Sequence, residues 1–300
     1  MATDGLVVVD KPGGMTSHDV VARVRRLARI RRVGHAGTLD PMATGVLVLG
    51  IGRATRLLSF VSGAEKGYAA TIRLGRSTVT DDADGETVAE VSAGDVTDQA
   101  IRTGLAAQTG EIDQVPSAVS AIKVAGRRAY QRVREGEAVV LPARRVVVSR
   151  LDVLAIHRVP DRPGLVDVDV DLACSSGTYV RAIARDLGAA LGVGGHVNAL
   201  RRTFVDGFTL AESATVDELE RRAPELVTVP LADAARRIFP PRQASAEQAR
   251  VLAHGGRLPT VGNPGPYAVF APSGEVVAIV TERDGLARPD VVLASTPDPT

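Results

Sequence analysis

The stretch Gly34-His35-Ala36-Gly37-Thr38-Leu39-Asp40-Pro41 stands just before an apolar run, Val46-Leu47-Val48-Leu49. Gly34 and Gly37 allow backbone angles that a side chain would forbid, and Pro41 biases Asp40 away from helix. The apolar run is typical of a buried strand. We therefore expect a stiff loop that presents the Asp40 carboxylate beside a strand. An ordinary Asp-Pro turn is the alternative reading of the dipeptide alone.

The composition is that of a globular protein with a sizeable core. The chain has 300 residues, of which 45% are hydrophobic and 24% charged, and both fractions are ordinary for such proteins. No apolar run approaches the roughly 20 residues of a membrane helix, and the N-terminus lacks the pattern of a signal peptide. Cys174 is the single cysteine, which excludes a disulfide framework or a multi-cysteine metal site within one chain. These features predict a cytoplasmic protein.

Charge is unevenly distributed although the formal net charge is only +1. Residues 1–60 carry nine basic and four acidic side chains, whereas residues 61–120 carry four basic and ten acidic ones. Basic faces on a nearly neutral protein suit a polyanion held along one side. Scarce aromatic residues, 3% of the chain, argue against a broad base-stacking surface and favour one extruded base in a small pocket.

Hydrophobic periodicity predicts strands and helices without regular alternation, which favours an α+β fold. Residues 166–173 alternate apolar side chains with three aspartates, as expected of a half-buried antiparallel strand. Residues 81–85 are typical of an exposed hairpin loop. A divalent-metal loop is the alternative, but the spacing of its remaining ligands is missing. Strands are expected at 6–9, 46–51, 68–74, 119–124, 267–270 and 276–280. Helices are expected after an N-cap at Ser17 and at 53–61, 96–107, 127–135, 178–191 and 246–253.

Six short motifs, in order along the chain, resemble those of the TruB family of bacterial tRNA pseudouridine synthases, and the resemblance spans about residues 5–210. The fit is looser where Ser117 and Val119 replace a proline and an aromatic residue that the family often has. The motifs are Asp10-Lys11-Pro12-Gly13-Gly14-Met15-Thr16-Ser17, residues 34–47, Lys66-Gly67-Tyr68, Ser120-Ala121-Ile122-Lys123, Gly177-Thr178-Tyr179-Val180-Arg181 and Leu200-Arg201-Arg202-Thr203.

The resemblance implies two domains. Residues 1–228 would form a catalytic domain of the pseudouridine-synthase type around a mixed, largely antiparallel sheet. Residues 229–300 would form a small β-rich, PUA-like RNA-binding domain after a cluster of prolines near residues 224–241. An unrelated stabilising appendage is the alternative for the second part.

The resemblance also implies the chemistry. Pseudouridine formation breaks the C1′–N1 bond of a uridine and rejoins the base through C5, without cofactor or metal. Asp40 would act at the sugar, as nucleophile or in removing a sugar proton. Arg181 would pair with it, since a carboxylate removed from water favours its neutral form unless a cation lies beside it. Tyr68 would stack on the base and is suited to relay the C5 proton.

Four further residues are implied in substrate binding. Lys11 would brace the floor of the site, His35 would fill the space that the flipped base vacates, Tyr179 would line the pocket and Leu200 would pack on the uracil. Arg201 and Arg202 would meet phosphates or merely solvent. The implied substrate is uridine 55 in the T loop of tRNA, a target consistent with the preference of RNA readers for loops. We expect a monomer without an obligate protein partner or membrane contact.

Three other functions remain open from the sequence. A noncatalytic RNA-binding protein would have no use for a carboxylate among phosphates. An isomerase of ribosomal RNA, or one that uses a guide RNA, is disfavoured modestly by the lack of a basic tail or extra recognition domain. A glycosidase would need a pair of carboxylates, and no second acid is placed by a motif beside Asp40.

Overall fold

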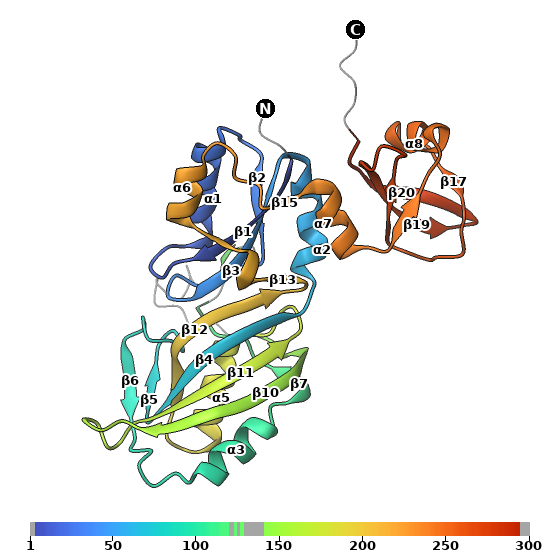
Figure 1. Ribbon diagram of the computed structural model, residues 1–300. Helices are drawn as coiled ribbons and strands as arrows, with labels where there is room; N and C mark the ends of the chain where they lie inside the picture. The colour runs from blue at the N-terminus through green and yellow to red at the C-terminus, as the bar shows by residue number, and fades with distance from the viewer. Residues whose placement is uncertain (1–3, 120–122, 125–126, 129–140, 295–300) are drawn as a thin grey trace.

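A mixed, eleven-stranded sheet forms the body of the protein. The computed structural model describes residues 4–119, 123–124, 127–128 and 141–294 (Figure 1). Most neighbouring strands are antiparallel, which confirms the predicted α+β class. Eight strands lie in the order β14 (Ala214–Thr215), β1 (Gly5–Lys11), β3 (Thr44–Ile51), β12 (Gly195–Val205), β4 (Lys66–Leu74), β11 (Val166–Cys174), β10 (Arg144–Arg158) and β7 (Gly110–Gln114). Three further strands pair outside this order: β2 (Val33–Ala36) with β3, β13 (Phe208–Thr209) with β12, and β15 (Val229–Pro230) with β1.

The sheet has two halves that meet where β3 lies parallel to β12. The pairing joins Thr44 with Arg201 and Gly45 with Arg202. Gly45 has a φ of +97°, and a Cβ there would lie 2.2 Å from the carbonyl oxygen of Arg202. Only glycine permits this approach of the two backbones. The junction therefore depends on one residue without a side chain.

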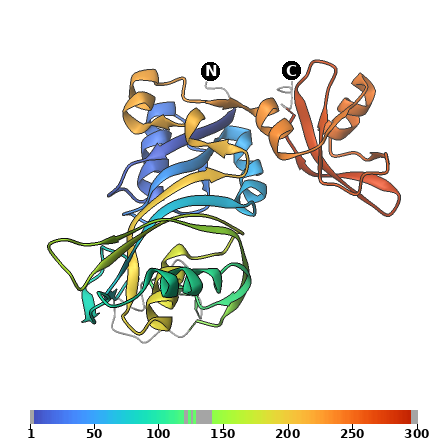
Figure 2. The same cartoon turned by 60° about the horizontal axis from the view of Figure 1, so that its bottom comes forward.

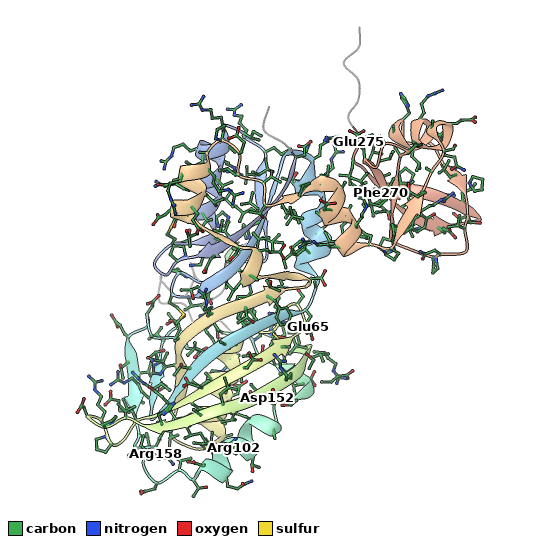
Figure 3. The ribbon with its side chains drawn as sticks, viewed as in Figure 1. Glu65, Arg102, Asp152, Arg158, Phe270 and Glu275 are labelled. Carbon is green, nitrogen blue, oxygen red and sulfur yellow. The ribbon has the colours of Figure 1, made fainter. Side chains whose placement is uncertain are left out.

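Helices cover one face of the larger half and leave the other open. Helices α3 (Asp98–Ala106) and α5 (Val180–Ala190) lie behind the sheet in Figure 1 and beneath it in Figure 2. The open face carries charged side chains, including Asp152 (Figure 3) and the pair Arg73–Asp167, whose Nη2 and Oδ2 atoms are 2.7 Å apart. β11 pairs antiparallel with both neighbours and alternates buried with half-buried residues, as predicted.

Strand β1 contributes to two hydrophobic cores. Val7 and Val9 point into the core shared with α1 (Ser17–Ala28), β4, β11 and α5. Leu6 and Val8 point into a second core, which includes Phe239, Phe270 and Ile279 from the C-terminal part. This alternation follows the two-residue period of a strand. Both cores are thereby attached to the same short segment.

A five-stranded sheet follows helix α7 (Leu231–Ile238), which packs against β1. The predicted hairpin at 267–280 and the helix at 246–253 are confirmed. The division of the chain at residues 228/229 remains a prediction. The small sheet has the order β16 (Pro241–Gln243), β18 (Tyr267–Phe270), β19 (Val276–Arg283), β20 (Leu286–Val292) and β17 (Leu258–Pro259), with α8 (Ala246–Ala253) beside it.

Several local expectations need correction. The N-cap of α1 is Thr16 rather than Ser17, and its hydroxyl accepts a hydrogen bond from the Asp19 amide. The helix expected at 53–61 is divided into a 3₁₀ helix, η1 (Gly52–Leu57), and α2 (Leu58–Ser62). Residues 127–128 form β9 (Arg127–Arg128), paired with β8 (Lys123–Val124), instead of beginning a helix. The remainder of that expected helix, 129–135, lies outside the described residues.

The loop expected to be exposed at 81–85 joins β5 (Arg76–Thr78) to β6 (Thr87–Glu90). Its second residue, Asp82, is buried and bridges to Val197. The expectation is therefore wrong at this residue, because a contact with β12 draws the turn inward.

Gly188, in α5, is required by close packing. A Cβ there would lie 2.1 Å from the Gly194 carbonyl carbon. We expect Gly188→Ala to lower the free energy of unfolding by about 2 kcal/mol through overpacking, although alanine favours helix. Gly207→Ala is the control, because its Cβ would meet nothing within 4 Å. Urea titrations of both variants measure the effect, and equal midpoints would contradict the packing argument.

Candidate active site

A cleft of about 290 Å³ opens beside the junction of the two sheet halves. Five of the seven residues predicted for the site line it: Asp40, Tyr68, Tyr179, Arg181 and Leu200. They come from the loop after β2, from β4, from the start of α5 and from β12. The fold thus brings together side chains from four segments that are far apart in the sequence.

Asp40 and Arg181 form an ion pair in this cleft. Nε of Arg181 lies 2.9 Å from Oδ2 of Asp40, and Nη2 donates to Oδ1 over 3.3 Å. The Arg181 side chain is 4% exposed, whereas Asp40 is 36% exposed. The carboxylate is therefore held from below by a buried cation and is open to a ligand from above.

Arg181 has further partners that fix its guanidinium. Nη1 donates to the Thr80 carbonyl oxygen over 2.6 Å, and lies 3.4 Å from Oδ2 of Asp82. Nη2 also donates to the Val119 carbonyl oxygen over 3.0 Å. Burial raises the pKa of Asp82, while the Thr80 hydroxyl and the Arg181 charge oppose that rise. Asp82 was missed from the sequence and belongs to this network.

The beginning of α5 sets the direction of Arg181. Gly177, with a φ of +91°, turns the chain after β11, and Tyr179 is the N-cap residue. The Gln114 side chain accepts from the Tyr179 amide over 2.8 Å and donates to the Tyr179 carbonyl oxygen over 3.1 Å. Gln114 thus compensates for a cap residue that makes no side-chain cap of its own. The positive end of the helix also favours a carboxylate nearby.

The Asp40 loop is held by buried side chains beneath it. Lys11 is fully buried, and its ammonium donates to the carbonyl oxygens of Pro12, Met15 and Pro41 over 2.8, 2.7 and 3.2 Å. The Ser17 hydroxyl exchanges hydrogen bonds with the backbone of Leu39. Burial lowers the pKa of Lys11 to about 8, and the nearby Asp40 charge opposes this. Lys11 lies under the loop and does not line the cleft.

Tyr68 and Leu200 face the cleft from neighbouring strands, and each is 8% exposed. Burial raises the pKa of the Tyr68 phenol, while the positive charge of Arg202 acts in the opposite sense. The phenol is therefore neutral at ordinary pH. Such a phenol can hydrogen-bond and stack, but it is a weak base.

His35 stands on β2, paired with Leu49, and not in the stiff loop that the sequence predicts for this stretch. Its ring contacts the His18 ring edge to face, with centroids 5.4 Å apart. Burial lowers the pKa of His35, so the ring favours its neutral form. Of its two flanking glycines, only Gly37 has a positive φ. His35 is not among the residues that line the cleft.

Two cations of the cleft were not assigned from the sequence. Lys66 is buried and donates to the carbonyl oxygens of Ser62 and Ala64. The Arg144 guanidinium lies 4.8 Å from the centroid of the Tyr179 ring. Lys66 belongs to the same motif as Tyr68, so the motif could have indicated Lys66 as a residue of the site. Nothing in the sequence distinguishes Arg144 from its neighbour Arg145.

Arg202 corrects part of a further expectation, since it does not meet solvent. It is fully buried, and its guanidinium donates to the carbonyl oxygens of Val46, Gly37 and Thr38 over 2.7, 3.1 and 3.4 Å. Arg201 points to the other side of the sheet and pairs with Asp10, with Nη2 and Oδ2 2.7 Å apart.

Within the described part of the chain, no three His, Cys, Asp or Glu side chains gather in a way that could hold a metal ion. Among the same residues, no helix is long and apolar enough to cross a membrane. Cys174 is buried, and burial raises the pKa of its thiol to about 11.

Solved structures share this architecture. A crystal structure of a Cbf5-Nop10-Gar1 complex contains a chain with a TM-score of 0.71 and 25% identity, covering 97% of this chain and 85% of that chain. A structure of an H/ACA RNP bound to a substrate RNA containing 2′-deoxyuridine matches with a TM-score of 0.70 and 24% identity, covering 97% and 85%.

Sequence comparison gives the family. Residues 25–180 match the N-terminal domain of the TruB family pseudouridylate synthases, residues 181–231 a tRNA pseudouridylate synthase B C-terminal domain, and residues 239–294 the C-terminal region of tRNA pseudouridine synthase II. The tRNA pseudouridine synthase B of Thermobifida fusca (strain YX) is 55% identical over 98% of this chain and 99% of its own length. That of Arthrobacter sp. (strain FB24) is 56% identical over 97% and 96%. The chain belongs to the TruB family of pseudouridylate synthases and is an isomerase.

Arg181→Lys tests the ion pair. A single ammonium cannot contact Asp40 at two points while also donating to Thr80 and Val119. We expect kcat to fall about a hundredfold, equivalent to about 2.7 kcal/mol, with a much smaller change in RNA affinity. Arg158→Lys is a matched control, because Arg158 pairs with Asp98 at the far end of the sheet (Figure 3). Unchanged turnover in Arg181→Lys would remove the ion pair from the mechanism.

Lys11 should make both kcat and the free energy of unfolding depend on pH, each in a defined direction. Its ammonium loses a proton as the pH rises through about 8, so the grip on Pro41 weakens and we expect kcat to fall. In the unfolded chain the same group keeps its proton up to about 10.5. Between these values the unfolded state binds more protons, and Lys11 therefore makes the free energy of unfolding rise with pH. Activity and this contribution to stability change in opposite directions.

The variant Lys11→Met isolates both effects. Its rate should be lower throughout and lack the decline near pH 8. Urea titrations on either side of pH 8 should show that the rise in the free energy of unfolding is smaller than in the wild type. If the variant keeps the alkaline decline, another group is responsible for it.

Proposed function

We propose that the protein isomerises uridine 55 in the T loop of tRNA to pseudouridine, with Asp40 as the reacting carboxylate. The observation that carries the proposal is the ion pair of a half-exposed Asp40 with a buried Arg181, in a cleft shared with Tyr68 and Leu200. Membership of the TruB family supports the reaction class. The relatives named tRNA pseudouridine synthase B support tRNA as the substrate.

The reaction needs one reactive carboxylate and a place for the base to turn. The C1′–N1 bond breaks and its electron pair leaves with the uracil, while Asp40 either attacks C1′ or removes a proton from the sugar. The base turns and C5 bonds to C1′. This step breaks the Asp40–C1′ bond if Asp40 attacked the sugar, or is accompanied by return of the proton from Asp40 to the sugar if Asp40 removed one. The C5 proton is then lost as N1 gains one. Arg181 holds the Asp40 carboxylate in place by contacting both of its oxygens. Tyr68, as a neutral phenol, stacks on the base and accepts or passes on a proton only in concert with a neighbour.

The remaining predicted residues have supporting roles in this proposal. Tyr179 lines the pocket and Leu200 packs on the uracil. Lys11 supports the loop from beneath, and His35 takes the space that the flipped base vacates. The reaction requires neither a cofactor nor a metal ion, since bonds are exchanged within one nucleotide without a redox step.

The proposed substrate suggests where the enzyme acts and which parts of the chain contact the RNA. We propose that the enzyme acts in the cytoplasm as a monomer on the T stem-loop, without an obligate protein partner. We also propose that residues 1–228 carry catalysis, and that residues 229–300 form the PUA-like part that contacts the RNA. The match of residues 239–294 to the C-terminal region of tRNA pseudouridine synthase II supports this division.

Asp40→Asn tests the chemistry directly. We expect tritium to be released from tRNA labelled at uridine C5, near one per tRNA, by the wild type and not by Asp40→Asn. Affinity for tRNA should stay within about tenfold, or roughly 1.4 kcal/mol, because the amide keeps the shape of the carboxylate. Asp171→Asn is the control, since Asp171 pairs with Arg150 on the open face of the sheet.

The outcomes separate the alternatives. Equal loss of affinity and rate in Asp40→Asn would show that Asp40 holds the fold or the RNA. Release that survives substitution of the T-loop uridine would place the target elsewhere. Tight tRNA binding by the wild type without release would favour a noncatalytic RNA-binding protein.

A further inference from the structure

Arg202 connects the two segments that carry Asp40 and Tyr68. Its guanidinium donates to the carbonyl oxygens of Gly37 and Thr38, in the loop that ends at Asp40. Its Nε donates to the Val46 carbonyl oxygen over 2.7 Å, which anchors the same side chain to β3. In β12, Arg202 is the antiparallel partner of Tyr68. Paired residues place their side chains on the same face, within contact of each other.

The loop lies directly on this side chain. Gly37 has a φ of +80°, and a Cβ there would lie 3.7 Å from Nη1 of Arg202 and 3.3 Å from Cε of Lys66. Arg202 is fully buried, and no carboxylate of the described residues pairs with it. Its charge is therefore satisfied by backbone carbonyls, two of which belong to the loop. Movement of the loop would leave a buried cation without these acceptors, which is strongly unfavourable.

We propose that Arg202 is a positioning residue, which fixes the Asp40 loop relative to Tyr68 so that both reach the same uridine. The inference rests on the proposed function, in which Asp40 and Tyr68 act on one base. Arg181 holds the Asp40 carboxylate from α5, whereas Arg202 holds the loop backbone from β12. Leu200, two residues earlier on the same face of β12, reaches the cleft itself. Strand β12 thus supplies both a contact to the substrate, through Leu200, and the residue that fixes Asp40 relative to Tyr68.

Arg202→Lys is the first test. A lysine has one nitrogen and cannot reach Val46 and the loop carbonyls together, so the loop loses its fixed distance from Tyr68. We expect kcat for tritium release to fall at least about thirtyfold, while KM for tRNA stays within about threefold. Arg73→Lys is the matched control, because Arg73 lies on the opposite face of β4 and pairs with Asp167. It should keep the wild-type kcat and KM.

Rescue separates positioning from folding. Arg202→Ala leaves a guanidinium-sized space, and added guanidinium at nondenaturing concentration should restore kcat, whereas methylammonium should not. If the alanine variant does not fold, the test is the kcat of Arg202→Lys, with the melting temperature of that variant measured to show that it is folded. A kcat that falls only in proportion to the folded fraction would overturn the inference, as would an unchanged kcat in Arg202→Lys. Loss of activity in Asp40→Asn beside an active Arg202→Lys would leave the proposed function intact. An active Asp40→Asn would refute the proposed function itself.

Discussion

The close approach of β3 and β12 is the constraint on which the rest of the structure depends. Gly45 has no side chain to keep the strands apart, and the Arg202 backbone occupies the space where a Cβ would be. The two halves of the sheet are joined here by two residue pairs, and the cleft opens beside that joint. A wider separation would move the Asp40 loop, which precedes β3, away from Tyr68 and Leu200 on the other half.

Charge is used differently on the two sides of the sheet. On the open face, arginines pair with aspartates in contact with water, and such pairs contribute at most about 1 kcal/mol each. Beneath the cleft, Lys11, Lys66 and Arg202 donate to backbone carbonyls. Burying a cation costs several kcal/mol, which carbonyl dipoles offset only when the geometry is kept. The buried cations therefore lower the free energy of unfolding at the place where the geometry of the Asp40 loop matters for the chemistry.

Hydrophobic periodicity predicts the class of fold, and the resemblance of short motifs to those of the TruB family implies the pairing of Asp40 with Arg181. The sequence does not reveal Asp82, since three aspartates before a glycine are typical of an exposed turn, and the bridge to Val197 that buries this residue is a tertiary contact. It also leaves Arg201 and Arg202 equivalent. Strand register decides which of the two faces inward, and a bulge between Val197 and Ala199 shifts that register.

The two-sided burial of β1 has a consequence for how the chain acquires its fold. This strand is translated well before its partners, because Val9 pairs with Ala214 and Leu6 with Val229, which follow more than 200 residues later in the chain. Contacts of such sequence separation slow folding, and an unpaired apolar strand is prone to aggregation in the interval. Because β1 contributes side chains to both cores, neither core can open alone. Its amides should then exchange with solvent only through unfolding that opens both cores.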